Sequence, residues 1–150
     1  MALFFPLKYM NPFTKSNSTE YELYFDGCCK GNPGVGGAGA VIYDDGKEIW
    51  GKSLYVGENT TNNIAEYTGL IFGLDAAVEM GIKTLVVKGD SQLVIKQMRG
   101  EYQVKSENLV PLFTEAKKLA SQINEISFVH VYRNENKRAD ELSNHGLDIV

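Results

Sequence analysis

The order of its patterned segments is the feature of this 150-residue chain that most restricts its fold. Three segments with strand character come first, and helical and strand patterns then alternate to the end. The expected strands cover residues 21–27, 37–45, 47–57, 83–90 and 125–133, and the expected helices 61–81, 91–100, 106–123 and 134–147. A short turn such as Asp45-Gly46 pairs its strands antiparallel, whereas strands separated by helices run parallel. We therefore predict an α/β fold with a mixed five-stranded sheet, antiparallel at its start, parallel at its finish and flanked by helices.

The composition is that of an ordinary globular domain. Apolar residues make up 43% of the chain and charged residues 23%, and no apolar run approaches the roughly 20 residues of a membrane-spanning helix. The formal net charge of −4 argues against a protein that grips nucleic acid by bulk basicity, but it leaves room for a local basic track or an acidic metal site. The adjacent Cys28 and Cys29 cannot pair without strain, so we expect reduced thiols in an intracellular protein, cytoplasmic or nuclear.

Residues 1–20 differ from the rest of the chain. They combine a short apolar patch with Pro6, Pro12 and an end rich in Ser, Thr and Asn. This mixture predicts a flexible leader ahead of one domain over residues 21–150. An organelle-targeting peptide is the alternative, because the first acidic residue is Glu20, but the segment contains no arginine.

The stretch YELYFDG, residues 21–27, places an aspartate where a core residue is expected. Its alternation puts Tyr21, Leu23 and Phe25 on one face of a strand and Asp26 on the other. Aspartate is disfavoured in strands. Asp26 therefore calls for an explanation beyond packing.

Three further acids occupy positions of the same kind. Glu66 lies early in the first helix, with Gly69 and Gly73 further along the same face, which predicts a close approach of this helix to the sheet. Asp90 ends an apolar strand, and Asp140 lies in the last helix. Each acid alone has an ordinary interpretation: Asp90 as a helix cap, Glu66 as a residue that favours a helix N-terminus, and Asp140 as a solvated helix residue.

Taken together, the acids favour a metal site. If the first strand is central, Asp90 lies beside Asp26 and the first helix lowers Glu66 toward both. Clustered carboxylates repel one another, and hard divalent cations neutralise them. Two such ions bridged across a scissile phosphate activate a water and stabilise the leaving oxygen. Asp26 is therefore interpreted as a metal ligand.

Four segments, in this order, resemble the motifs of type 1 ribonuclease H: YFDGCCKGNPGVGGAGAVIY, TTNNIAEYTGLIFGL, KGDSQLVIKQM and RNENKRADELS. The resemblance covers nearly all of residues 21–147 and implies a ribonuclease H-like fold for the domain. It implies an endonuclease that hydrolyses the RNA strand of RNA–DNA hybrids and leaves 5′-phosphate and 3′-hydroxyl ends. We expect the hybrid as partner, no membrane association, and a monomer.

The resemblance also implies the roles of the four acids. Asp26, Glu66, Asp90 and Asp140 would bind two Mg²⁺ ions, for which Mn²⁺ can substitute. Asp26 and Asp90 would bridge the ions or hold one closely. Glu66 would bind the ion nearer the 2′-hydroxyl side, and Asp140 the ion that positions the nucleophilic water.

Further positions match the family's substrate contacts. These positions, which would meet the minor groove or its sugars, are Cys29, Asn32, Asn62, Asn63 and Gln92. Thr61 falls where a DNA phosphate is held. Short amides and hydroxyls suit the recognition of 2′-hydroxyls. Asn32 serving only its turn, and Thr61 or Asn62 only a helix cap, remain open alternatives.

Two features depart from the family pattern. The loop before the last helix is short and lacks the histidine that many members carry there; Arg133 stands near it and is a candidate for phosphate binding. His130 lies within the last expected strand, grouped by alternation with Tyr132, and is expected to be an ordinary half-buried residue, while His145 is expected at the surface. The segment 93–109 lacks the basic handle of some relatives, so hybrid affinity should be modest and strongly salt-dependent. The basic residues that could form a weak track are Lys96, Arg99, Lys117 and Lys118.

Three alternatives stay open. The first is another nuclease of the same superfamily, such as a junction resolvase or an integrase-like enzyme, but GNPG, TTNN and GDSQ together favour the hybrid-cleaving branch. The second is a catalytically silent hybrid-binding module, which loss of a carboxylate would favour; all four acids are present. The third is a domain cut from a reverse transcriptase, against which the start methionine and leader favour a free-standing protein.

Overall fold

The computed structural model describes residues 20–149. The predicted leader, apart from Glu20, lies outside the described residues. None of the helices within residues 20–149 is both long and apolar enough to cross a membrane.

The centre of the molecule is a five-stranded mixed sheet, as predicted. Its strands are β2 (Tyr21–Gly31), β3 (Gly34–Asp44), β4 (Lys47–Thr60), β5 (Thr84–Gly89) and β6 (Glu125–His130). They lie in the order β4-β3-β2-β5-β6, with the β4–β3 and β3–β2 pairs antiparallel and the β2–β5 and β5–β6 pairs parallel. The first strand of the chain is therefore central.

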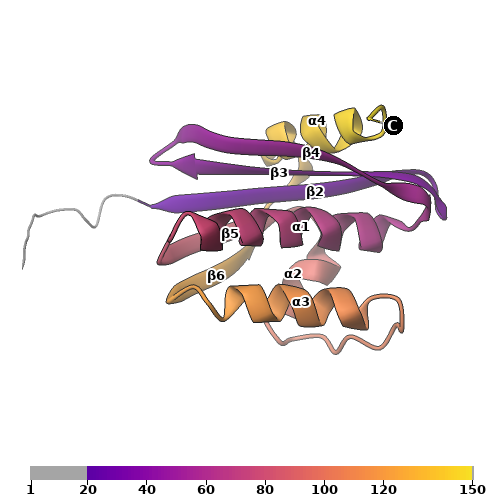
Figure 1. Ribbon diagram of the computed structural model, residues 1–150. Helices are drawn as coiled ribbons and strands as arrows, with labels where there is room; N and C mark the ends of the chain where they lie inside the picture. The colour runs from indigo at the N-terminus through magenta and orange to yellow at the C-terminus, as the bar shows by residue number, and fades with distance from the viewer. Residues whose placement is uncertain (1–19, 150) are drawn as a thin grey trace, which may run out of the picture.

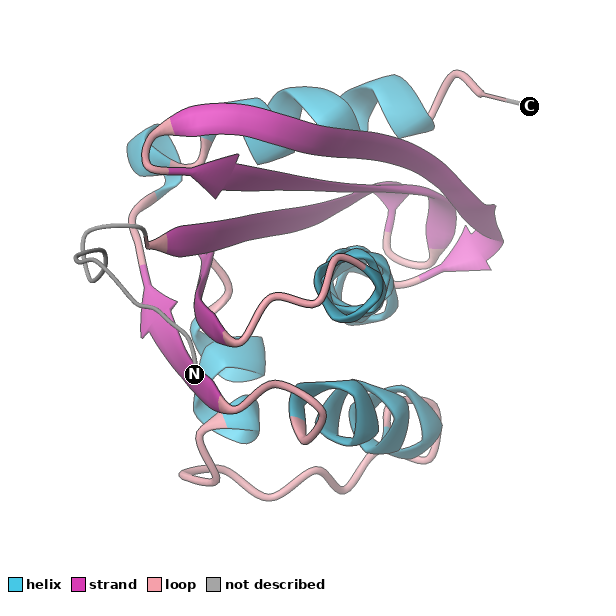
Figure 2. Cartoon of the chain, turned by 60° about the vertical axis from the view of Figure 1, so that its left-hand side comes forward, coloured by secondary structure: helices cyan, strands magenta, loops and turns pink. Residues whose placement is uncertain are grey.

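Helices cover both faces of this sheet (Figures 1 and 2). The helical elements are α1 (Asn62–Glu79), α2 (Gln92–Met98), α3 (Val110–Ala120), the 3₁₀ turn η1 (Arg133–Glu135) and α4 (Lys137–Gly146). α1 lies against one face of the sheet with α3 beside it, and α4 lies on the opposite face. On the α1 side, Leu23 and Phe25 of β2 pack with Leu70 and Leu74 of the helix. A smaller cluster on the other side joins Val41 of β3 to Ala139 and Leu142 of α4.

Several boundaries differ from the sequence-based expectation: β3 begins at Gly34 instead of 37, β4 ends at Thr60 instead of 57, and α3 covers Val110–Ala120 instead of 106–123. β2 continues to Gly31 instead of ending at residue 27, because the glycine-rich stretch after Asp26 pairs with β3 and leaves only Asn32 and Pro33 in the turn. β6 ends at His130 instead of 133, and the last expected helix is split into η1 and α4. Pro111 lies in the first turn of α3, where its missing N–H costs no helical hydrogen bond.

α1 approaches the sheet closely at its glycines, as predicted. A Cβ atom on Gly69 would lie 2.7 Å from the carbonyl oxygen of Asp26, and one on Gly73 would overlap the side chain of Leu23. These approaches are possible only without side chains. The contact between α1 and β2 brings the start of the helix to the strand that carries Asp26.

Candidate active site

The parallel pair β2–β5 ends where the acids begin. Its last paired residues are Phe25 and Gly89, so Asp26 and Asp90 follow at the carboxyl end of this parallel pairing, although β2 itself continues to Gly31 beside β3. In open α/β sheets, crevices form outside the carboxyl ends of the strands. The register of the sheet therefore places these two carboxylates beside one opening.

Glu66 reaches the same opening from α1. Thr61 caps this helix, and its Oγ1 accepts a hydrogen bond from Ile64 N at 3.3 Å. A Cβ atom on Gly27 would overlap the backbone of Ala65 and Glu66. The missing side chain at Gly27 lets the first turns of α1 rest on β2, directly beside Asp26.

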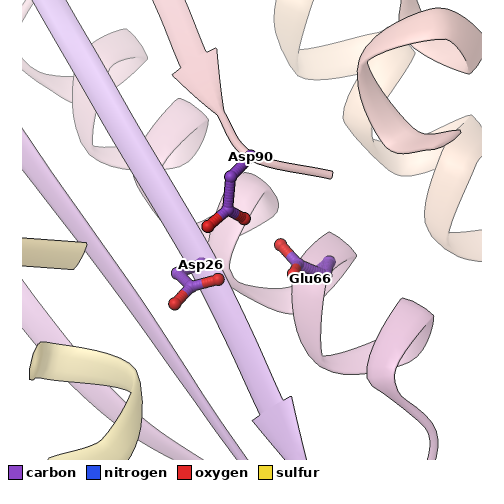
Figure 3. A group of neighbouring side chains, drawn as sticks. All are labelled: Asp26, Glu66 and Asp90. Carbon is purple, nitrogen blue, oxygen red and sulfur yellow. The ribbon is translucent and has the colours of Figure 1, made fainter. Parts of the chain in front are cut away.

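The three side chains converge, as Figure 3 shows. One carboxylate oxygen from each of Asp26, Glu66 and Asp90 can be chosen so that all lie within 4.8 Å of one another. Asp26 is 5% exposed and Glu66 9%. Glu66 Oε1 is buried and has no hydrogen-bond partner among the described residues. An unpartnered buried carboxylate oxygen beside two others fits a hard divalent cation, whose preferred ligands are carboxylate oxygens.

The electrostatics of the cluster agree with this fit. Burial, followed by the charges of Asp90 and Asp140, raises the pKa of Asp26 from 3.8 to about 7. Burial, followed by Asp26 and Asp90, raises the pKa of Glu66 well above its usual range. Like charges in a desolvated site disfavour ionisation of one another. Without a cation, the buried carboxyls therefore hold protons that a cation would displace.

Asp140 stands at the edge of the cluster. It lies in the first turn of α4, is half-exposed, and its Oδ1 accepts from Asn144 Nδ2 at 3.3 Å. It lines the same open cleft of about 430 Å³ as the other three acids. The structure thus brings the four predicted carboxylates to one cleft, with three of them in the tight group.

The ordinary interpretations of the acids are corrected at two positions. Asp90 is not a helix cap: Ser91 caps α2, and its Oγ accepts from Val94 N at 3.2 Å. Glu66 lies beyond the first turn of α1, where it is buried instead of serving the helix N-terminus. Neither Asp90 nor Glu66 caps a helix, and both residues line the cleft.

Ser143 is a part of the site that sequence reasoning missed. It is fully buried on α4, and its Oγ lies 3.2 Å from Asp26 Oδ2 and 2.9 Å from Asp140 O, either of which can accept its single proton. Gly39 of β3 allows this contact, because a Cβ atom there would lie 2.5 Å from Ser143 N. The available signal was the spacing of three residues from Asp140, which places both on one helix face.

The predicted substrate contacts divide into two groups. Asn62, Asn63 and Arg133 line the cleft. The others lie around it: Asn32 Oδ1 accepts from Asn62 N at 3.0 Å, Cys29 Sγ donates to Thr60 O at 3.4 Å, Thr61 caps α1, and Gln92 is exposed at the start of α2. Thr61 thus takes its alternative role as the cap of α1, whereas the Asn32 side chain reaches beyond its own turn to the first residue of that helix. Cys28 and Cys29 are free thiols, as expected, and burial raises the pKa of each.

The second wall of the cleft comes from the end of β6. Its lining residues here are His130, Val131, Tyr132 and Arg133. His130 is half-buried in its strand, as predicted, but its place in the cleft was missed. Tyr132 is 72% exposed, and its ring lies edge-to-face with that of His130, with centroids 5.6 Å apart and planes at 80°. Strand alternation gave no signal for a cleft wall, because it does not say where a strand ends.

The chain matches known proteins over most of its length. The family model described as reverse transcriptase-like matches residues 24–146. A bifunctional protein of Mycobacterium tuberculosis is 43% identical over 124 residues, which are 82% of this chain and 34% of that protein; this chain thus spans about a third of the length of the mycobacterial relatives it matches. The ribonuclease H of Pseudomonas savastanoi is 39% identical over 149 residues, covering 89% of this chain and 96% of that protein.

Solved structures that resemble this chain also carry the name ribonuclease H. The N-terminal ribonuclease H domain of the mycobacterial protein, solved as a fusion, superposes with a TM-score of 0.83 at 40% identity, covering 87% of this chain and 95% of that one. The RNase H1 of Halobacterium salinarum gives 0.82 at 36% identity, covering 87% and 99%. LC11-RNase H1, solved in complex with an RNA/DNA hybrid, gives 0.80 at 38% identity, covering 86% and 97%. From the sheet order, the carboxylate cluster and these matches, we conclude that the chain belongs to the type 1 ribonuclease H family.

Proposed function

We propose that this protein is an endonuclease that hydrolyses the RNA strand of RNA–DNA hybrids and leaves 5′-phosphate and 3′-hydroxyl ends. The observation that carries the proposal is the convergence of Asp26, Glu66 and Asp90, with Asp140 beside them, in one open cleft. The complex of LC11-RNase H1 with an RNA/DNA hybrid and the relatives named ribonuclease H support the choice of substrate.

Asp26, Glu66 and Asp90 would hold a divalent cation, and Asp140 is placed to complete a second position. We propose two Mg²⁺ ions, for which Mn²⁺ can substitute. When bound, such ions neutralise the charge of the scissile phosphate and lower the pKa of a nearby water. The residues around them have separate tasks: Ser143 orients Asp26 through its hydroxyl, and burial of Glu66 fixes its carboxylate in the cleft. Groups that orient a ligand in this way commonly tune its affinity for metal.

The remaining polar side chains suit a hybrid. Asn62 and Asn63 present amides to the cleft beside the carboxylates, and amides can both donate to and accept from a 2′-hydroxyl, the group that distinguishes RNA from DNA. Arg133 offers a positive charge for a phosphate at the opposite wall. Cys29, Asn32, Thr61 and Gln92 are proposed to act further along the groove, where Asn32 and Thr61 also position the start of α1.

The test is cleavage of an end-labelled RNA–DNA hybrid with Mg²⁺ or Mn²⁺, with single-stranded RNA, duplex RNA and duplex DNA alongside. We expect cutting of the hybrid's RNA strand alone. Asp26→Asn should abolish it while leaving the fold intact. Asp75→Asn is the matched control, because this exposed aspartate of α1 lies outside the cleft-lining residues. Folded wild-type protein that binds the hybrid but cuts it with neither metal would instead support the silent binding module.

A further inference from the structure

We propose that Tyr132 is a substrate-contact residue whose ring packs flat against a ribose next to the scissile phosphate, and that His130 is the positioning residue that holds the ring. This inference rests on the proposed function and extends it to the segment after β6, which lines the same cleft as the carboxylates. It assigns a recognition role to the segment where the histidine loop is short.

The exposure of Tyr132 is the first observation. Its side chain is 72% exposed, the highest value among the exposed large hydrophobic residues of the described chain, and it lines the same cleft as Asp26 and Asp90. An apolar ring left in water gains free energy when a ligand covers it, and tyrosine combines this apolar face with a polar tip. A ligand in the cleft would cover this ring.

The ring is also held before any ligand arrives. The edge of one ring faces the other in the His130–Tyr132 pair, at 5.6 Å between centroids. The backbone is fixed on both sides of the residue: Tyr132 N donates to Glu135 Oε1 at 3.0 Å, and Tyr132 O accepts from Glu135 N at 2.8 Å. Side chains that are ordered in advance lose less entropy on binding. This arrangement distinguishes Tyr132 from an exposed residue on a mobile loop.

The chemistry of a hybrid decides which of its groups the ring meets. The bases of a duplex are paired and stacked on one another, so their faces are not available to a side chain at its surface. The sugars are exposed along the groove, and a flat ring can pack against them. The neighbouring Arg133 supplies charge for the phosphate, so the contact of Tyr132 is uncharged and can be separated from it experimentally.

The test measures hybrid affinity in the Asp26→Asn background, where binding is observed without cleavage. Fluorescence anisotropy with a labelled hybrid is recorded at several salt concentrations. Adding Tyr132→Ala should weaken binding by about tenfold at every salt concentration, within the range expected when an aromatic side chain is covered by a ligand. The slope of log K against log salt should not change, because no charge is removed. Arg133→Ala, in contrast, should make that slope shallower by about one.

Two further variants separate the ring from its hydroxyl and from general damage. Tyr132→Phe should bind within about twofold of the Asp26→Asn parent, because the ring face is kept. Met80→Ala is the matched control: Met80 is 43% exposed at the far end of α1 and should leave affinity unchanged. Unchanged affinity in Tyr132→Ala, or an equal loss in Tyr132→Phe, would overturn the proposal.

The role of His130 in holding the Tyr132 ring is tested by a separate pair of variants. His130→Ala should weaken binding several-fold, and His130→Phe should restore it, because phenylalanine again offers an aromatic partner to Tyr132. Failure of His130→Phe to restore affinity would show that the imidazole acts in another way. In the wild-type background, Tyr132→Ala should raise KM and leave kcat within about twofold. If the wild type cuts no hybrid, the proposed function fails; if it cuts and Tyr132→Ala changes nothing, only this inference fails.

Discussion

The carboxylate of Asp26 is approached by side chains from both faces of the sheet. Ser143 of α4 can donate to its carboxylate from one side, and Glu66 of α1 approaches it from the other, beyond the end of the β2–β5 pairing. The backbone N–H of Gly27 favours the ionised form of Asp26, but burial outweighs this and raises its pKa to about 7. The surroundings therefore disfavour the ionised form of Asp26, and a bound cation would offset this unfavourable free energy.

The raised pKa of Asp26 predicts that the stability of the metal-free protein depends on pH. Between pH 4 and 7, folded protein holds a proton on Asp26 that the unfolded chain has lost, since the ordinary pKa is 3.8 and the folded value about 7. The contribution of this group to the free energy of unfolding is thus largest below the ordinary pKa, and it falls as the pH rises toward 7, by about 1.4 kcal/mol per pH unit. The raised pKa of Glu66 acts in the same direction. Chemical denaturation in EDTA should show Asp26→Asn increasingly more stable than wild type from pH 5 to 8.

Saturating Mg²⁺ should reverse that order at pH 8, because wild type gains binding free energy that Asp26→Asn largely loses. A stability difference between the two proteins that is independent of pH in EDTA would contradict the assigned protonation.

Ser143 supplies a second prediction for a single residue. Ser143→Ala removes the hydroxyl that can donate to Asp26 and changes little volume, so Asp26 should be oriented less firmly. We expect the Mg²⁺ concentration for half-maximal hybrid cleavage to rise by about 10-fold or more, the range known for groups that orient metal ligands. Ser121→Ala is the matched control, because Ser121 is exposed after α3 and its hydroxyl donates only to Lys118 O. An unchanged Mg²⁺ requirement would show that Asp26 needs no such support.

Among the elements, α1 depends most closely on small residues in its contact with the sheet. Alanine is favoured over glycine in a helix by about 1 kcal/mol, yet Gly69→Ala would place a Cβ atom 2.7 Å from Asp26 O and 2.9 Å from Gly39 O. Both neighbours are backbone atoms of the central strands and cannot rotate away. We expect Gly69→Ala to lower the free energy of unfolding by about 1–3 kcal/mol in spite of its helix propensity.

Gly51→Ala in β4 provides the control for this variant. Its added Cβ atom would meet only the side-chain ends of Glu48 and Leu142 at 3.1 and 3.6 Å and the Ala40 carbonyl oxygen at 3.9 Å. Flexible side chains can adjust, so stability should stay within about 0.5 kcal/mol of wild type. Equal effects of Gly51→Ala and Gly69→Ala in urea denaturation would refute the close contact of α1 with the sheet.

Most of the helices and strands could be predicted from patterns in the sequence. Alternation in β2, the glycines of α1 and the acids at the ends of elements predicted the sheet and the four carboxylates, because each is a local signal. The continuation of β2 to Gly31 depends on pairing with β3, and the split before α4 depends on the tertiary position of Asn136, whose Nδ2 donates to Phe25 O. Ser143 and Tyr132 join the site through contacts between distant segments, which no local pattern contains.

On the scale of the whole molecule, acidic residues outnumber basic ones, 19 to 15. Several of the basic side chains are paired with acids: Lys88 with Glu22, Arg99 with Glu101, and Arg138 with Glu48 and Glu141. Paired charges release fewer counterions from a nucleic acid than free ones. Recognition of a hybrid should therefore depend on shape, sugars and the metal site more than on bulk charge.

This balance predicts a shallower salt dependence than the strong one expected from the sequence alone. If two or three phosphates are neutralised, the slope of log K against log salt should be about −2 to −3, and raising salt from about 50 to 200 mM should weaken hybrid binding by roughly 15- to 60-fold. Anisotropy with Asp26→Asn measures this without cleavage. Arg99→Gln should leave the slope unchanged, because Arg99 is paired with Glu101 at 3.1 Å. A slope of about −6 or steeper would mean that the chain engages about seven phosphates, and recognition by bulk charge would then replace recognition by the cleft.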